Sequence, residues 1–415
     1  MISRRDFVKG GVALVSIGTT AQSLLKGAVA FAAQNSAYVA DPNNKKTLII
    51  VQLAGGNDGI NTLVPASDPV YRSSRKTIGL PEDQVLPLAE GFSLHPALTG
   101  LKGLWDDGKL AVVRGVGYPN QNYSHFKSSA IWQAGDPEMN LDNGWLGRTL
   151  EQMESQQHDP FLGFNVGNST PDEMRTPKIA IPSVTDEADY GVKVAGKLVP
   201  TTEARTATML KLYEQYPSNS PYGVLLETTA DSAVSSSKML QDAAKTYKPA
   251  VEYPQTSFAA GLSLLAEAIT SDLGVRVGHA TLGGFDTHNN ELAEHQERME
   301  TLDGGLTAFY QDLQAHGKAD DVVVLTWSEF GRRVAENANG GTDHGAASVC
   351  FALGNGVQKG LYGDAPNLAA LIDNGNVPYT TDFRRVYATV IERWLGVPSE
   401  ALLGQRWDPL GFLAA

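Results

Sequence analysis

The sequence predicts an α/β fold, a three-layer α/β/α sandwich with a mostly parallel central sheet. Two observations predict it. From about residue 45 onwards, apolar strand-like runs alternate with segments of helical spacing, an order that implies a parallel sheet covered by helices. The chain has 415 residues, of which 42% are hydrophobic and 19% charged, a globular composition long enough for a substantial core.

The first expected elements are two strands, each followed by a helix or a corner. The run 47–55 is a buried strand that breaks into the glycine corner Gly55-Gly56-Asn57-Asp58-Gly59. Residues 95–108 have helical spacing, and 109–118 form the second strand. A short helix is expected over 124–135, beginning at Ser124.

The middle of the chain, residues 139–255, is less periodic and rich in Pro, Ser, Thr and Asn. It contains one helix-like piece, 202–216. We interpret 139–255 as an insertion or cap built on a main α/β domain that covers residues 45–415.

The alternation of helices and strands resumes after the insertion. The expected elements are helix 257–274, strand 275–284, helix 289–317, strand 321–331, strand 347–356 and helix 382–396, the last with Asp382 as its N-cap.

The N-terminal residues 1–32 have the pattern of an export signal. The paired Arg4 and Arg5 stand in "SRRDFVKGG", ahead of a mildly apolar run that ends in small residues. This order resembles the twin-arginine signal, so we expect the twin-arginine translocation machinery as a partner and a periplasmic or extracellular location. The apolar stretch contains Thr, Gln and Lys, which argues against a permanent membrane span.

Charge and cysteine content exclude other classes of protein. A net charge of −13 argues against nucleic acid or an anionic membrane as the main partner. Cys350 is the only cysteine, which excludes an intrachain disulfide and a cysteine-rich metal site.

Polar residues at strand ends are the candidate site, because ligands of open α/β sheets bind outside the carboxyl ends of the strands. The candidates are Asp58 after the first strand, Ser124 and His125 after the second, Asp286 and His288 after strand 275–284, Glu329 in "TWSEFGRR", and Asp343 and His344 before strand 347–356. Mixed sets of histidines and carboxylates suit divalent ions, here zinc, manganese, calcium or iron.

Each candidate also has a structural interpretation. Asp58 could form an Asx-turn in its glycine corner, and Ser124 could be a helix N-cap. Asp286 could cap the following helix, while Glu329 and Arg332 could form an ion pair in a loop. Because the candidates share the ligand edge of the sheet, their joint interpretation as a metal site is favoured.

The motifs "LIIVQLAGGNDGINTLVP", "SHF", "GGFDTHNN", "TWSEFGRR" and "GGTDHGAA" occur in this order along the chain. They resemble the signatures of a bacterial family of exported proteins, catalogued as domain of unknown function fifteen-oh-one. The resemblance covers essentially the whole chain after the signal. That family is placed in the alkaline phosphatase-like superfamily, with sulfatases and phosphodiesterases, and the resemblance therefore implies that fold.

The resemblance also implies roles for individual residues. Superfamily enzymes use two metal ions and a Ser, Thr or modified Cys nucleophile. By this resemblance Ser124 stands in the place of the nucleophile, and the metal ligands are Asp58, Asp286, His288 and His344. Ser328-Glu329 stands where the superfamily has Asp-His, and Asp286 and His288 are two residues apart rather than four. Because of these departures, the resemblance does not decide whether the protein binds one metal ion or two.

Two functions follow from these residues. The first is an exported metal-dependent hydrolase of phosphate or sulfate esters, acting on a small anionic ester or a surface glycan. Ser124 would attack, His125 would orient the substrate, and Arg332 or Lys127 would clamp the anion. The alternative is a non-catalytic exported protein that keeps the fold for binding or assembly. "SHFKS" lacks the Pro and Arg of a formylglycine motif, which disfavours a sulfatase of that type.

Overall fold

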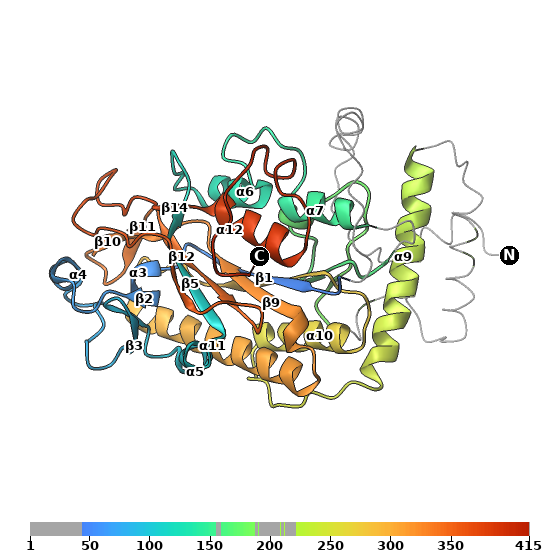
Figure 1. Ribbon diagram of the computed structural model, residues 1–415, viewed down its shortest axis with the longest axis horizontal. Coiled ribbons are helices and arrows are strands. Elements are labelled where there is room, and N and C mark those ends of the chain that lie inside the picture. Colours follow the sequence, from blue (N-terminus) through green and yellow to red (C-terminus); the bar gives the residue numbers. More distant parts are fainter. Residues whose placement is uncertain are drawn as a thin grey trace.

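A computed structural model describes residues 44–154, 159–186 and 221–414, together with the single residues 190, 208 and 211 (Figure 1). The expected signal, 1–32, and most of the expected helix 202–216 lie outside the described residues. Among the described helices, none combines the length and apolar character that a membrane crossing requires.

A nine-stranded sheet forms the centre of the described part of the chain, in the order β13-β5-β12-β9-β1-β8-β6-β7, with β14 beside β5. The strands are β1 Thr47–Ala54, β5 Leu110–Gly117, β6 Gly163–Val166, β7 Ser183–Val184, β8 Val277–Gly283, β9 Val322–Trp327, β12 Ser348–Leu353, β13 Gly360–Tyr362 and β14 Thr381–Asp382. Only β12 pairs antiparallel with its neighbours, β5 and β9. The expected α/β class with a mostly parallel sheet is confirmed.

Strand β1 shows why an uninterrupted apolar run was needed here. It pairs in parallel with β8 on one side and β9 on the other, so both of its edges are hydrogen-bonded, and a core packs against each of its faces. Ile49, Val51 and Leu53 contribute to one hydrophobic core, and Leu48 and Ile50 to a second core on the opposite face.

Helices cover both faces of the sheet, which gives the expected three layers (Figure 1). One layer contains α5 Thr99–Asp106, α10 Ser257–Thr270 and α11 Glu291–Ala315. The opposite layer contains α6 His125–Ala134, α7 Trp145–Met153 and α12 Phe383–Thr389, which continues into a π-helical turn, Val390–Trp394. Helix α9, Pro221–Ala244, stands at the end of the molecule remote from α4 (Figure 1).

Residues 139–255 do not form a separate cap throughout. Strands β6 and β7 extend the central sheet beyond β8, and α7 belongs to a helical layer. The expectation of an insertion is therefore corrected for residues 145–184, whose apolar side chains are part of the main cores.

Smaller elements surround the carboxyl edge of the sheet. They are α3 Gly59–Thr62, β2 Leu63–Val64, α4 Pro69–Ser74, β3 Leu86–Ala89, β4 Phe92–Leu94, and the two-stranded pair β10 Arg332–Glu336 and β11 Thr342–His344. Short 3-10 turns lie at Asp172–Met174 and Ala319–Asp321. The pair β10–β11 brings Arg332 opposite His344.

Candidate metal centre

The glycine corner after β1 is required by a close approach of two chain segments. Gly55 and Gly56 have φ angles of 121° and 73°, which side chains rarely adopt. A Cβ atom on Gly55 would lie 2.6 Å from the backbone nitrogen of Asp286. The corner therefore lets the end of β1 pack directly against the segment that carries Asp286.

Asp58 lies beyond this corner, and its carboxylate is committed to another residue. It is completely buried and forms a two-point ion pair with Arg75, including an Nη2–Oδ1 contact of 2.9 Å. It also accepts a hydrogen bond from the backbone of Ile60 as the cap of α3. Burial alone would raise the pKa of Asp58, but the Arg75 guanidinium outweighs it and holds that pKa well below its ordinary value. The expected metal ligand Asp58 is thus neutralised by an arginine.

Three other candidates do meet at one point. Oδ1 of Asp286 lies 3.0 Å from Nε2 of His344 and 3.1 Å from Nε2 of His288. The two Nε2 atoms are themselves 3.0 Å apart. Asp286 and His288 follow β8, and His344 ends β11, so segments far apart in the chain supply this cluster.

His125 joins the cluster from the start of α6. Its Nε2 lies 3.4 Å from Oδ2 of Asp286, and His125, Asp286 and His344 offer ligand atoms that all lie within 4.8 Å of one another. We call His125, Asp286, His288 and His344 the metal cluster. Sequence reasoning had placed His125 beside a substrate and not among the metal ligands.

Glu329 stands behind His125 and outside the metal cluster. One of its oxygens, Oε1, is 2.8 Å from Nδ1 of His125 and accepts a hydrogen bond of 2.9 Å from the backbone of Gly55. The carboxylate is almost completely buried. The expectation that Glu329 is a metal ligand is therefore corrected, because its contact orients a histidine instead.

The hydrogen bonds of the histidines fix which nitrogens are free. Nδ1 of His344 is 2.8 Å from the carbonyl oxygen of Tyr123, which only accepts, so this nitrogen carries the proton. In neutral His344 the Nε2 lone pair then faces the carboxylate of Asp286, and His125 has an Nε2 with no hydrogen-bond partner. Lone pairs that converge on a carboxylate repel one another unless a cation lies between them. The donor set thus fits a divalent ion that binds nitrogen and oxygen.

The pKa shifts within the cluster follow from these contacts. The hydrogen bond to Glu329 raises the pKa of His125 against the opposing effect of burial. Burial lowers the pKa of His344, which favours its neutral form. Burial would raise the pKa of Asp286, but the hydrogen bond and the positive charge of Arg332 oppose it, and that pKa is lowered to about 2. Asp286 is therefore a carboxylate at neutral pH.

Arg332, the expected anion clamp, is fully buried and cannot reach a substrate. Its Nη2 donates to Oδ1 of Asp286 at 2.8 Å and to the carbonyl of Phe285, and its Nε donates to the carbonyl of Gly56 at 2.6 Å. Further bonds reach the carbonyls of Gly55 and Thr342. Arg332 is thus a positioning residue that holds Asp286 against the glycine corner.

Asp343 and Arg333 lie at the side of the metal cluster. Oδ1 of Asp343 is 3.7 Å from Nδ1 of His288, and Oδ2 accepts a bond of 3.3 Å from Arg333. Asp343, an expected ligand, therefore lies on the Nδ1 side of His288, away from the Nε2 atom that faces Asp286. Glu329 has the same relation to His125. Arg333 is partly exposed, unlike Arg332, and was missed because its neighbour in the same motif was preferred.

Ser124 occupies the N-cap position of α6 with extended backbone angles of −91° and 125°. Its hydroxyl makes no capping hydrogen bond, in contrast to Thr256 at the start of α10. The simple interpretation of Ser124 as a side-chain cap is therefore not supported by its contacts.

Two further residues shape the centre without having been expected. Phe330 packs its ring 4.9 Å from the ring of His125 and 4.6 Å from that of His344, measured between centroids. Tyr123 holds His344 through its carbonyl, and its hydroxyl is 3.0 Å from Asp373. The available signal was that Phe330 follows Glu329 in "TWSEFGRR" and that Tyr123 directly precedes "SHF".

The chain belongs to the family described as "Protein of unknown function (DUF1501)", whose model matches residues 110–404. This range includes every member of the metal cluster. No curated protein matches the sequence.

Several solved structures have a similar course of the chain. A sulfatase from Pseudoalteromonas sp. has 12% identity and a TM-score of 0.38 over 89% of this chain and 72% of its own. A protein in the alkaline phosphatase superfamily from Vibrio parahaemolyticus has 10% identity and a TM-score of 0.36, over 87% and 69%. The C-terminal periplasmic domain of EcEptC from Escherichia coli, in complex with Zn, has 10% identity and a TM-score of 0.36, over 77% and 74%.

Proposed function

We propose that this protein is a metal-dependent hydrolase of phosphate or sulfate esters. The observation that carries the proposal is the convergence of three Nε2 atoms on the carboxylate of Asp286, in a site that is held in place by hydrogen bonds to Glu329 and to the carbonyl of Tyr123. Such a set of ligands with ordered outer partners is typical of metal sites rather than of loops.

His125, Asp286, His288 and His344 would hold one divalent ion, zinc or a related metal. When bound, the ion supplies a Lewis acid that draws negative charge from the transferring group. Glu329 and the carbonyl of Tyr123 keep the Nδ1 atoms of their histidines engaged, which leaves Nε2 free as ligand. Arg332 keeps Asp286 in its charged form.

Ser124 is proposed as the nucleophile. Its hydroxyl precedes His125 and is not used for capping, so it is free to attack phosphorus or sulfur, with the alcohol part of the ester as leaving group. The first amides of α6 lack partners within the helix and face the same end, where they favour negative charge. Lys127 and Arg333 replace Arg332 as candidates for contacts with the anion.

A non-catalytic protein that binds or assembles at the cell surface is the second candidate. The observation that favours it is the state of Asp58, which is neutralised by Arg75 and leaves a single metal cluster among the described residues. Chemistry that needs two metal ions is disfavoured by this arrangement. A single ion could serve only to shape a binding surface.

The metal content of gently purified protein tests both candidates. We expect about one equivalent of metal per chain, together with turnover of aryl phosphate or aryl sulfate esters. Asp286→Asn should lose both, while Asp272→Asn, which changes an exposed ion pair with Lys318, should lose neither. Protein without metal and without turnover would reject the hydrolase, and metal without turnover on either ester would favour the binding protein.

We also propose export through the twin-arginine pathway, with cleavage near residue 32. The support is the sequence pattern around Arg4 and Arg5. Replacing both arginines with Lys should trap the precursor in the cytoplasm. Unimpaired export of that double variant would reject this route.

A further inference from the structure

Three exposed apolar side chains stand next in sequence to residues of the metal cluster or of the hydrogen bonds that support it. Phe126 directly follows His125 and is 90% exposed, although it stands in the first turn of α6. Leu371 and Ile372 are 40% and 41% exposed, and they directly precede Asp373, which bonds the Tyr123 hydroxyl. Phe126, Leu371 and Ile372 are called the apolar rim below.

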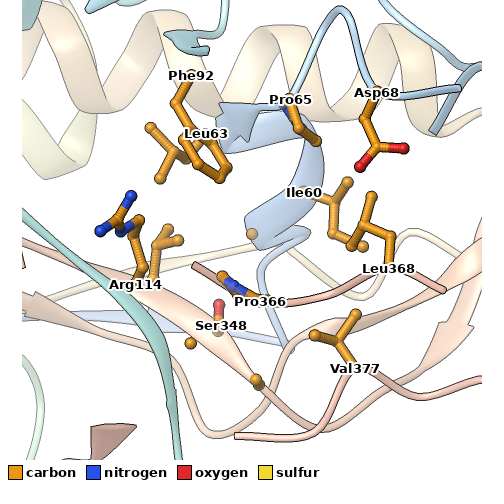
Figure 2. Close-up of a pocket in the computed structure, with 14 residues that line it drawn as sticks. Ile60, Leu63, Pro65, Asp68, Phe92, Arg114, Ser348, Pro366, Leu368 and Val377 are labelled. Atoms are coloured by element: carbon orange, nitrogen blue, oxygen red, sulfur yellow. The ribbon is translucent and has the colours of Figure 1, made fainter. Parts of the chain in front are cut away.

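The loop that carries Leu371 and Ile372 also lines an apolar cavity of about 60 Å³ (Figure 2). Leu368 and Val377 from this loop face Ile60 of α3, while Leu63 and Phe92 close the side near Arg114 (Figure 2). The loop is tied to the metal cluster, since Asp373 and Asn376 both bond the Tyr123 hydroxyl at 3.0 Å and Tyr123 holds His344. One loop thus connects an apolar cavity to the polar centre.

The polar groups of the cavity are largely occupied. Arg114 donates to the carbonyl of Gly363 and to Glu90, and Asp68 caps α4 by accepting from Val70. The Ser348 hydroxyl donates to the carbonyl of Asn57, and the rest of the lining is glycine, aliphatic or aromatic, so the cavity offers contacts to hydrocarbon and few to hydroxyl groups. A sugar ring would leave its hydroxyls without partners there, whereas an alkyl chain would not.

We propose that the substrate is an amphiphile, an anionic ester whose alkyl chain lies on the apolar rim and enters the cavity. This inference rests on the hydrolase proposed above and selects lipid-like esters over glycan esters as its substrates. The charged head would lie at the metal cluster, and the chain would cover Phe126 and Ile372, side chains that otherwise remain in water.

A chain-length series tests the inference. Alkyl phosphate and alkyl sulfate monoesters from ethyl to octyl are compared by kcat/KM below their micelle concentrations, and the matching alkyl phosphonates by calorimetric binding. We expect a gain of about fourfold per methylene, with a plateau once the rim and the cavity are filled. Phe126→Ser and Ile372→Ser should flatten this dependence while ethyl esters react as before.

Met139→Ser is the matched control. Met139 is 53% exposed and lies beyond the far end of α6, so its loss should leave the chain-length series unchanged. Leu368→Trp, which fills the cavity, should lower the plateau. Turnover without any chain-length dependence, or a preference for a sulfated glycan over octyl esters, would overturn the inference and leave the hydrolase intact. If none of the esters is turned over, the proposed hydrolase is rejected. If the affinity for alkyl phosphonates then does not change with chain length, the inference about the alkyl chain is rejected separately.

Discussion

His125 directs its Nδ1 atom toward Oε1 of Glu329 at 2.8 Å, across 204 residues of sequence. The contact turns the opposite nitrogen, Nε2, toward Asp286. A buried carboxylate that holds a histidine in this way fixes the tautomer and makes the imidazole a better metal ligand. In the proposed metal site, Glu329 would therefore support metal binding through His125.

Glu329→Gln should weaken metal binding about 10- to 100-fold, since the neutral amide no longer favours a proton on Nδ1 of His125. Competition with a chelator of known affinity measures the change. Glu336→Gln is the control, because Glu336 accepts backbone bonds from Thr77 and Ile78 away from the cluster. Equal weakening in both variants would show that the effect is not specific to the histidine contact.

Asp58→Asn should lower the free energy of unfolding by roughly 3–5 kcal/mol and leave the metal stoichiometry unchanged, because it leaves Arg75 buried without its partner. Urea denaturation and metal analysis at low temperature measure the two quantities. If folded Asp58→Asn protein loses its metal, Asp58 is a metal ligand after all.

Glu291→Gln should stabilise the protein at alkaline pH. Burial and then the charge of Asp58 raise the pKa of Glu291 to about 9, from an ordinary value of 4.5. A raised pKa gives stability that is fully present below about pH 4.5 and is lost as the pH rises through 9. The glutamine keeps the neutral state and escapes this loss.

The stability difference between Glu291→Gln and the wild type should therefore be small at pH 4 and grow toward pH 9, with an upper slope of about 1.4 kcal/mol per pH unit. Denaturation in urea across this range measures it. A difference that does not change with pH would show that Glu291 is charged in the folded protein.

Gly55→Ala should disturb the metal cluster more than its backbone strain alone predicts. A Cβ atom at Gly55 meets backbone atoms of Phe285 and Asp286, which cannot move aside as a side chain can. Gly91→Ala is the matched control, because Gly91 also has a positive φ but open space around it. Both variants should lose stability, and only Gly55→Ala should lose metal affinity. Equal metal affinity in the two variants would contradict the role assigned to the corner.

The sheet could be predicted from the sequence because strands such as β1 and β9 are buried on both faces and must therefore be continuously apolar. That Asp286, His288 and His344 come together could be predicted because each lies beside a strand in a glycine-rich segment. The direction of β12 could not, since the β10–β11 pair intervenes and returns the chain at the same carboxyl edge, so that β12 runs antiparallel to β9.

The local sequence pattern could not predict which groups form ion pairs or hydrogen bonds with the candidate residues. Arg75 follows α4 and reaches Asp58 from a position fixed by its hydrogen bond to Val334 in β10, and no spacing rule connects the two residues. Glu329 and Arg332 were assigned to a metal and a substrate because both stand at a strand end, yet burial directs each of them to a protein group. A position at the ligand edge of the sheet therefore predicts which residues lie near one another. The atoms that each side chain contacts depend on tertiary packing.

Ser124→Ala should remove turnover while the free energy of unfolding changes by less than about 0.5 kcal/mol, because the Ser124 hydroxyl makes no capping bond. Thr256→Ala is the matched control, since Thr256 does cap α10 and its loss should cost roughly 0.5–2 kcal/mol without affecting turnover. Urea denaturation and turnover of an aryl phosphate, measured on the same preparations, separate the two roles. A destabilised but fully active Ser124→Ala protein would show that Ser124 is a cap and that a water molecule is the nucleophile.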